Sequence, residues 1–382
     1  MALGCAGIVS CSSFIKPQLI PFEEAISSLA TRLLDQIKAD PAAAGKETIS
    51  VMFIPFADAD SGEVPEVSRS IEKIIIEIGR HNFKGFNLAR LTSKNIGHTD
   101  YIINGTIRLG SYKTLFAKTA SKNYHVYGEV RGLADPKVIG KAGVWISDMN
   151  LDYTPTAIYR DSPLYLQGSA MTKPAKVQYQ PYEEDFLDIS LKTRAMLIEA
   201  RMAYEHKDYT AAKALFSMAA QRQDGQDLGT YAGLYLANHK LGRLEEAEKA
   251  FAKVVSISVE KYRFLTVKYL FGVNSVDFLQ DENLKARYDT WIRHIGQYFH
   301  NTNYCLRIVG HASRTGTEAY NYKLSLERAK SIQKRLQNTF PEVVQRSETV
   351  GRGFSENIAG IGTDDERDAL DRRVELFIVD CK

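Results

Sequence analysis

The sequence lacks long hydrophobic runs and any marked excess of charge. No run of about 18 apolar residues, the length that spans a bilayer as a helix, occurs in it. Its 49 Lys and Arg residues nearly balance its 46 Asp and Glu residues, for a net charge of +3 at pH 7. This balance gives no reason to expect a nucleic acid or an anionic membrane surface as a partner.

Motifs of common enzymes and cofactor sites are also missing. There is no P-loop and no dinucleotide fingerprint. There is no His-Glu-x-x-His zinc helix and no Gly-x-Ser-x-Gly elbow. His311 has no Cys or carboxylate at nucleophile or ligand spacing, and the Asp58–Gly62 turn lacks the bidentate Glu of a calcium loop, because Arg69 stands there. We therefore expect no catalysis, no metal and no cofactor.

Cysteine is scarce, with four residues in two pairs. Cys5 and Cys11 lie near the N-terminus. Cys305 starts one predicted strand and Cys381 ends the last. If these strands are antiparallel neighbours, the two sulfurs could meet in a disulfide; the alternative is two unpaired buried thiols.

What is present is the composition of an ordinary globular protein of two to three domains, with 44% apolar and 25% charged residues. Residues 14–150 alternate helical and strand patterns, which predicts an α/β sandwich with one sheet and helices against it. The expected helices cover 21–37 and 67–78, the expected strands cover 49–56, 85–91, 100–112, 124–133 and 138–147, and the expected turns lie at Gly110 and at Asp135-Pro136.

The middle of the chain changes character twice. Residues 151–190 are rich in Pro and Tyr without periodicity, which favours an extended linker. Residues 191–260 are helical in pattern and contain an internal repeat with an offset of 247 − 212 = 35 residues, in which Ala212 corresponds to Ala247 and Phe216 to Phe251. The alternatives are a pair of repeats for protein partners or a plain helical spacer.

The stretch from Leu306 to Arg328 carries the most chemistry. An apolar strand is followed by a polar turn at 310–316 and then by a helix. On that helix, Asn321, Ser325 and Arg328 share one face. Since a guanidinium grips a carboxylate with two parallel hydrogen bonds, the sequence predicts a small polar pocket here.

This stretch resembles the OmpA-like peptidoglycan-binding domain, over roughly 262–382. The pattern of that family appears as Gly310-His311, Gly316, Tyr320-Asn321, Leu324-Ser325, Arg328-Ala329 and Asp371 to Glu375, and upstream as Phe271 to Ser275, like its first strand.

The resemblance implies a C-terminal α/β sandwich with a peptidoglycan site lined by Asn274, Asn321, Arg328 and Arg372. Arg328 would bind the carboxylate of the stem peptide. Ser313 stands where the family usually has an Asp that meets the ammonium of diaminopimelate. Glu318 or Asp371 could supply the missing charge.

Three further resemblances concern the rest of the chain. Residues 1–13 are similar to the tail of a lipoprotein signal, with Cys11, or alternatively Cys5, as the lipidated residue; a buried or frayed N-terminus is the alternative. Residues 14–150 resemble the flagellar outer-membrane lipoprotein family (FlgO-like), and 191–260 resemble two tetratricopeptide hairpins.

Together these features predict an α+β and α/β multidomain protein in the periplasm, anchored to the outer membrane. The first hypothesis is a non-enzymatic protein that binds peptidoglycan stem peptides and tethers the outer membrane, with partner proteins bound through 191–259. The alternative is an assembly factor of a flagellar or secretion machine, in which wall binding only positions the complex.

Overall fold

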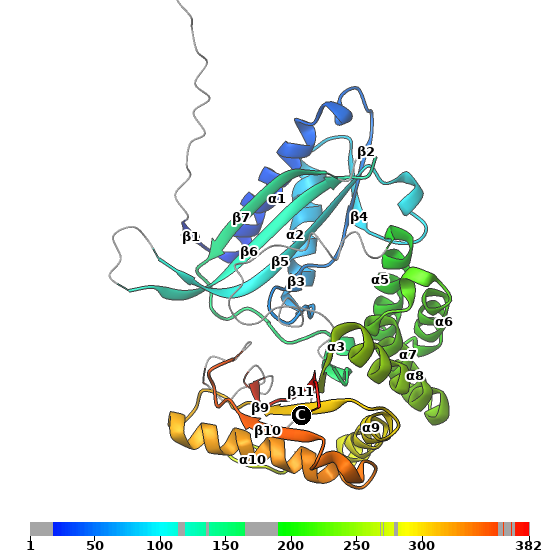
Figure 1. Cartoon of the computed structure of the whole chain (residues 1–382). Coiled ribbons are helices and arrows are strands. Elements are labelled where there is room, and N and C mark those ends of the chain that lie inside the picture. The colour runs from blue at the N-terminus through cyan, green and yellow to red at the C-terminus, as the bar shows by residue number, and fades with distance from the viewer. Residues whose placement is uncertain are drawn as a thin grey trace, which may run out of the picture.

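The computed structural model describes residues 18–113, 119–134, 137–164, 190–267, 269, 271–278, 282–357, 362, 368 and 371–381. They form three parts: an N-terminal unit up to residue 164, a helical unit over 190–262, and a C-terminal unit from residue 264 (Figure 1). In this described part of the chain, no helix is both long and apolar enough to cross a membrane.

The N-terminal unit is one mixed sheet with two helices on one face (Figure 1). Its strand order is β1-β7-β6-β5-β2-β4, with β3 paired to β5. The elements are β1 (Leu19–Ile20), α1 (Phe22–Lys38), η1 (Pro41–Ala43), β2 (Ile49–Phe53), β3 (Ala57–Asp58), α2 (Val67–Asn82), β4 (Phe86–Arg90), η2 (Ile96–His98), β5 (Tyr101–Tyr112), β6 (Ser121–Gly132) and β7 (Val138–Ile146).

The periodicity of the sequence explains why these helices form and which face they bury. Ile26, Leu29, Leu33 and Ile37 of α1 recur at helical spacing and are all 0% exposed, so the predicted stripe is confirmed as the face against the sheet. The predicted helix over 67–78 and the five predicted strands also form, with ends that differ by a few residues.

The predicted turn at Gly110 is wrong. Gly110 lies inside β5 and pairs with Asn123 of β6. A Cβ at this position would lie 3.0 Å from the Trp145 ring, so glycine is there because an aromatic side chain covers the strand. The turn expected at Asp135-Pro136 lies outside the described residues.

The segment after β7 is less extended than the predicted linker. Up to residue 164 it forms a short helix, α3 (Ala157–Asp161), and packs on both neighbours. Pro155 bridges to Pro65 of the N-terminal unit, and Leu164 bridges to Val267 of the C-terminal sheet. The remaining part, 165–189, lies outside the described residues.

The helical unit consists of two hairpins that match at their turns. Lys207 and Gly242, which are 35 residues apart, both have a left-handed backbone with φ of 63° and 70°. Ala212 and Ala247 are buried at the equivalent crossing points, as the repeat predicts. The elements are α5 (Leu191–Glu205), α6 (Tyr209–Ala220), η4 (Gln223–Gly225), α7 (Leu228–Lys240), α8 (Leu244–Ile257) and the π-helix η5 (Ser258–Tyr262).

The C-terminal unit is a four-stranded sheet of order β10-β9-β11-β8, with α9 and α10 packed on it (Figure 1). Strand β11 is antiparallel to both β9 and β8, and β10 is parallel to β9. The elements are β8 (Phe264–Val267), α9 (Glu282–His300), β9 (Cys305–Gly310), α10 (Glu318–Leu336), η6 (Pro341–Val343), β10 (Ser347–Gly351) and β11 (Val374–Val379).

The first strand of this unit is not where the sequence placed it. Strand β8 ends at Val267, and residues 271–275 form a turn instead. Gly272 donates its N–H to the carbonyl of Asp277, and Asn274 has a positive φ of 53°. A left-handed residue inside such a turn breaks the ladder that a strand requires.

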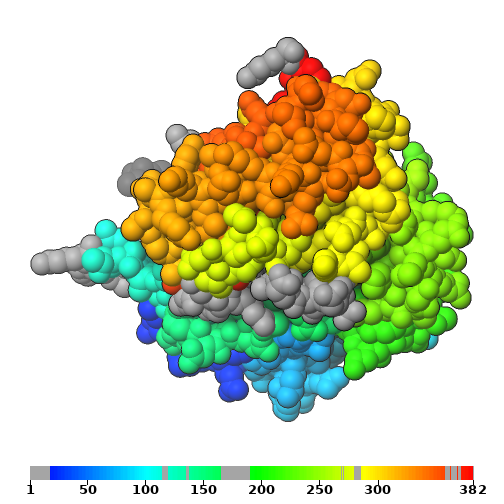
Figure 2. Space-filling view, turned by 90° about the horizontal axis from the view of Figure 1, so that it is seen from below, coloured from blue at the N-terminus to red at the C-terminus, as the bar shows by residue number. Residues whose placement is uncertain are grey.

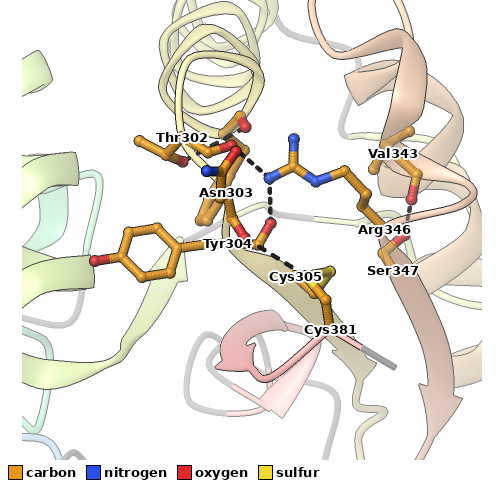
Figure 3. The surroundings of a disulfide bond; sticks show 9 residues. Thr302, Asn303, Tyr304, Cys305, Val343, Arg346, Ser347 and Cys381 are labelled. Atoms are coloured by element: carbon orange, nitrogen blue, oxygen red, sulfur yellow. Dashed lines mark hydrogen bonds between the residues drawn. A yellow bond between two sulfur atoms is a disulfide. The ribbon is translucent and has the colours of Figure 1, made fainter.

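Cys305 and Cys381 are joined by a disulfide, with 5.2 Å between their Cα atoms (Figure 3). The bond is possible because β11 runs antiparallel to β9 and Val379 lies opposite Cys305. Beside it, Arg346 donates to the carbonyls of Thr302 and Tyr304, both at 2.5 Å. The bond and these contacts fix the start of β9 to the end of the last strand.

The helical unit packs against both other units through apolar contacts. At one end, Ala195 and Ile198 of α5 share a core with Met52, Ile54 and Ile102 of the N-terminal sheet.

At the other end, Trp291 of α9 donates to the hydroxyl of Tyr235 of α7 at 2.7 Å. Figure 2 shows the N-terminal unit (blue to cyan) and the C-terminal unit (yellow to red) on opposite sides of the molecule, with the green helical unit beside both.

Candidate ligand pocket of the C-terminal unit

The polar loop between β9 and α10 is held from the helix side. Thr317 caps α10 by accepting the N–H of Tyr320 at 3.3 Å. The amide of Asn321 donates to the carbonyls of Thr315, at 2.8 Å, and Thr317, at 3.2 Å. Asn321 is buried, so its first role is to fix the loop.

The helix and the sheet approach each other unusually closely at this point. A Cβ on Gly310 would lie 1.9 Å from the carbonyl oxygen of Ser325, so only glycine fits at the end of β9. The Ser325 hydroxyl accepts the N–H of Gly353 at 2.9 Å and thereby holds the turn after β10. This contact places the helix face that bears Arg328 directly behind the loop.

Arg328 is fully buried and bonds to three backbone carbonyls. Its Nε donates to Ser275 at 3.1 Å, its Nη1 to His311 at 3.2 Å and its Nη2 to Gly272 at 3.2 Å. Its guanidinium carbon also lies 5.1 Å from the centre of the Phe271 ring. One side chain therefore ties the turn over 271–275 to the end of β9.

The charge of Arg328 has no carboxylate partner among the described residues. Its three acceptors are neutral carbonyls. Burial and the nearby charge of Arg372 lower the pKa of Arg328 to about 10, which leaves it a cation at neutral pH. A buried cation whose hydrogen bonds go to neutral carbonyls is stabilised when an anion binds to it.

The remaining candidate residues differ in their exposure. Asn274 is exposed and lies between the two turn carbonyls that Arg328 holds. Ser313 and Arg372 are each 7% exposed, and Ser313 follows His311 by two residues. Of the two carboxylates considered as substitutes for the family Asp, Glu318 is exposed at the start of α10 and Asp371 is fully buried.

A second polar cluster, which the sequence analysis missed, lies on the strand side of the loop. His311 is 1% exposed, and its Nε2 lies 3.1 Å from the Glu375 carboxylate, which also accepts from Arg373 at 2.8 Å. Burial would raise the pKa of Glu375, but Arg373 and His311 outweigh it and lower this pKa to about 2. Burial and Arg373 lower the pKa of His311. Arg373 lies just before β11 and Glu375 lies within it, and their spacing of two residues was the signal available in the sequence.

The N-terminal candidates, Cys5 and Cys11, lie outside the described residues. Among the described residues, no group of three or more His, Cys, Asp or Glu side chains is arranged to hold a metal ion.

Comparison with known proteins concerns the C-terminal unit. Residues 279–370 match the model of the OmpA family, so this unit is an OmpA-like domain. No curated protein matches the chain.

Solved structures similar to this part include the peptidoglycan-associated lipoprotein from Burkholderia pseudomallei, with 22% identity over 31% of this chain and 90% of that one and a TM-score of 0.26. The cell wall anchor of the T6SS from Pseudomonas aeruginosa has 21% identity over 34% of this chain and 95% of that one, with a TM-score of 0.26. The periplasmic domain of MotB from Helicobacter pylori has 17% identity over 30% of this chain and 74% of that one, with a TM-score of 0.24.

Proposed function

We propose that this is a non-enzymatic protein of the cell envelope that binds peptidoglycan through its OmpA-like C-terminal unit. The observation that carries the proposal is the buried Arg328, which donates to three neutral carbonyls, has no carboxylate partner among the described residues and lies near Arg372. The carboxylate of a peptidoglycan stem peptide is an anion of the kind that such a site attracts.

Because Arg328 is covered, the ligand must exchange with a group that now bonds to it. Two of its three acceptors, Gly272 and Ser275, belong to the turn that carries the exposed Asn274. A carboxylate binds a guanidinium more strongly than a carbonyl does, so the exchange is favourable. In this proposal Asn274 and Asn321 orient the peptide, and Arg372 adds a second positive charge to the site. Ser313 offers a hydroxyl at the position where the family usually has the charged Asp.

The test is co-sedimentation of residues 18–382 with purified peptidoglycan. We expect the native chain to pellet and Arg328→Ala to bind at least about tenfold more weakly, since a hydrogen bond to a charged group contributes about 1.5–3 kcal/mol. Arg307→Ala is the matched control, because Arg307 is an exposed cation of the same unit that pairs with Glu348.

A folding defect must be separated from a binding defect, because Arg328→Ala also removes three structural hydrogen bonds. Asn274→Ala and Arg372→Gln therefore accompany it, and thermal unfolding is measured for each variant. A native chain that stays in the supernatant contradicts the proposal. If every variant that loses binding has also lost its fold, the assigned site is contradicted.

We further propose a location in the periplasm with an outer-membrane anchor through Cys11 or, alternatively, Cys5. A disulfide between Cys305 and Cys381 suits an oxidising compartment. Mass spectrometry of the mature protein, with and without Cys11→Ser, tests the anchor; an unmodified N-terminus contradicts it.

A second candidate function is assembly of an envelope machine, with the helical unit acting as tetratricopeptide-like repeats. Two large apolar side chains are exposed on this unit, Met218 at 50% and Leu244 at 58%. Exposed apolar side chains suit a protein interface. If a protein co-purifies with the native chain but not with the double variant Met218→Asp and Leu244→Asp, this candidate function is supported. If the complex is unchanged, a role for these two side chains is contradicted.

A further inference from the structure

A pocket remote in sequence from the candidate site around Arg328 lies between the N-terminal unit and helix α5. On one side it is formed by Ile54 and Pro55, just past the end of β2, and by Arg90 at the end of β4. Because β2 and β4 are parallel, the pocket lies at the carboxyl ends of neighbouring strands, where open α/β sheets bind ligands. Its other wall is α5.

The pocket is small, and part of its lining is aliphatic. Its volume is about 80 Å³, against about 10–15 Å³ for a single water, so it holds a group of about five to eight heavy atoms. Leu197, Ile198 and Met202 contribute the α5 wall, opposite Ile54 and Pro55. This aliphatic part of the wall suits a short branched aliphatic group, and the small volume excludes a whole sugar or nucleotide.

Four arginines and three carboxylates also line it, and most of them are already paired. Arg90 binds Glu72 through its Nε, at 3.0 Å, and its Nη2, at 2.5 Å. Arg69 pairs with Glu205 at 2.8 Å across the junction of the two units. The third carboxylate, Asp227, caps α7 by accepting the N–H of Thr230 at 2.8 Å.

Arg201 differs from Arg69 and Arg90. It is half-buried, its guanidinium carbon lies 5.5 Å from the centre of the Tyr159 ring, and among the described residues it forms no ion pair with a carboxylate. Since a cation beside apolar walls lacks part of its hydration, an anionic ligand would gain more there than at the surface.

A buried hydroxyl is the second, independent sign of a ligand. Thr156 lines the pocket and is 1% exposed, and its Oγ1 has no hydrogen-bond partner in the described part of the chain. Buried polar atoms are nearly always satisfied, so this one indicates a missing partner. A carboxylate oxygen can accept its hydrogen.

We propose that this pocket binds a carboxylate carried on a short branched aliphatic group, with Arg201 and Thr156 on the carboxylate and Ile198 and Met202 on the hydrocarbon. The same chemistry occurs in a free aliphatic acid and in the C-terminal residue of a peptide. The ligand contacts both units, so it also stabilises their junction.

The experiment titrates the full chain with 4-methylpentanoate and with its uncharged amide, 4-methylpentanamide, in a calorimeter. We expect the acid to bind and the amide to bind at least about tenfold more weakly, the ratio that corresponds to one charge-assisted hydrogen bond. This comparison uses the native chain, so it does not depend on whether a variant folds.

Variants then assign the residues. Arg201→Gln is expected to weaken the acid at least about tenfold and Thr156→Val less strongly. Arg243→Gln, an exposed cation on the same helical unit and outside the pocket, is expected to leave binding unchanged. A peptide that ends in leucine, tested with a free and with an amidated C-terminus, decides the source of the carboxylate: tighter binding of the free peptide than of 4-methylpentanoate assigns a chain terminus, and binding of the acid alone assigns a free acid.

The proposal is overturned if neither acid nor peptide binds, if the amide binds as well as the acid, or if Arg201→Gln leaves the affinity unchanged in a folded protein. None of these results bears on peptidoglycan binding, because this pocket shares no residue with the candidate site around Arg328.

Discussion

At the scale of single residues, Arg328 stabilises the fold as well as offering a charge. Its three carbonyl partners come from two chain segments that no strand pairing joins. Removing it would leave the buried carbonyl of His311 unsatisfied, at about 1–3 kcal/mol, and would release the half-buried carbonyls of Gly272 and Ser275. This is why its role in binding can be measured only beside variants such as Asn274→Ala.

Ser313→Asp is the residue change that should strengthen peptidoglycan binding. The position is 7% exposed, so a carboxylate there is desolvated until an ammonium group of the ligand pairs with it. We expect about tenfold tighter binding, from one added charge-assisted hydrogen bond, together with lower stability of the free protein. Co-sedimentation and thermal unfolding measure the two effects.

Ser313→Asn is the control for this change, since it has the size of Asp without the charge. If Asn strengthens binding as much as Asp does, the ammonium contact is not the cause. If Asp weakens binding, the ligand lies in a different pose.

The cluster of His311, Arg373 and Glu375 predicts a loss of stability in acid. Because the pKa of Glu375 falls to about 2 in the folded protein, below its ordinary value of 4.5, the unfolded state binds the proton more readily. Its contribution is therefore complete above about pH 4.5 and is lost as the pH falls toward 2. His311, whose pKa is also lowered, acts in the same direction below its ordinary value of 6.5.

Urea unfolding between pH 7 and pH 3 checks this. Glu375→Gln should lower stability at pH 7 and flatten its fall in acid, whereas Glu327→Gln, which removes an exposed partner of Lys330, should change neither. A slope that Glu375→Gln leaves intact would contradict the assignment.

At the scale of elements, the contact between β9 and α10 depends on Gly310. An alanine Cβ would lie 1.9 Å from the Ser325 carbonyl oxygen, and backbone atoms cannot yield as side chains do. We expect Gly310→Ala to lower the free energy of unfolding by about 2–3 kcal/mol. Gly97→Ala, where nothing lies within 4 Å, should be nearly neutral in the same thermal unfolding measurement.

Periodicity in the sequence predicted the elements well where one face is buried. The α1 stripe and the alternating strand β11 are examples, since burial of one face imposes the pattern directly. Gly110 and the turn over 271–275 were assigned wrongly because each depends on a distant partner: the Trp145 ring in the first case and the Arg328 guanidinium in the second. A local stretch of sequence does not show which distant residues will contact it.

In the structure, Asn321 bonds to the loop between β9 and α10, and Arg372 lies near enough to Arg328 to lower its pKa. The sequence named Asn321, Arg328 and Arg372 as candidate site residues, and their role in binding stays a prediction. It could not show that Arg328 is fully buried, because the segment that covers it lies more than fifty residues earlier in the chain.

At the scale of the whole molecule, the helical unit joins the other two by different chemistry. The junction with the N-terminal unit combines a small apolar core with the pair of Arg69 and Glu205. The junction with the C-terminal unit is aromatic, with Trp291 bonded to Tyr235 and stacked near Phe251. The pocket that contains Arg201 and Thr156 lies at the junction with the N-terminal unit. Its lining comes from separated stretches of the chain, so no motif in the sequence predicted it.

The position of β11 has a consequence for the order in which the chain can fold. This strand follows all the other described strands along the chain, yet it lies inside the sheet, between β9 and β8. Until β11 is available, β9 and β8 each have an unpaired edge where β11 will bind. Cys305 also lacks its disulfide partner until then. The C-terminal unit therefore cannot complete its sheet while the chain is still emerging from a ribosome, because the sheet has to wait for its last strand.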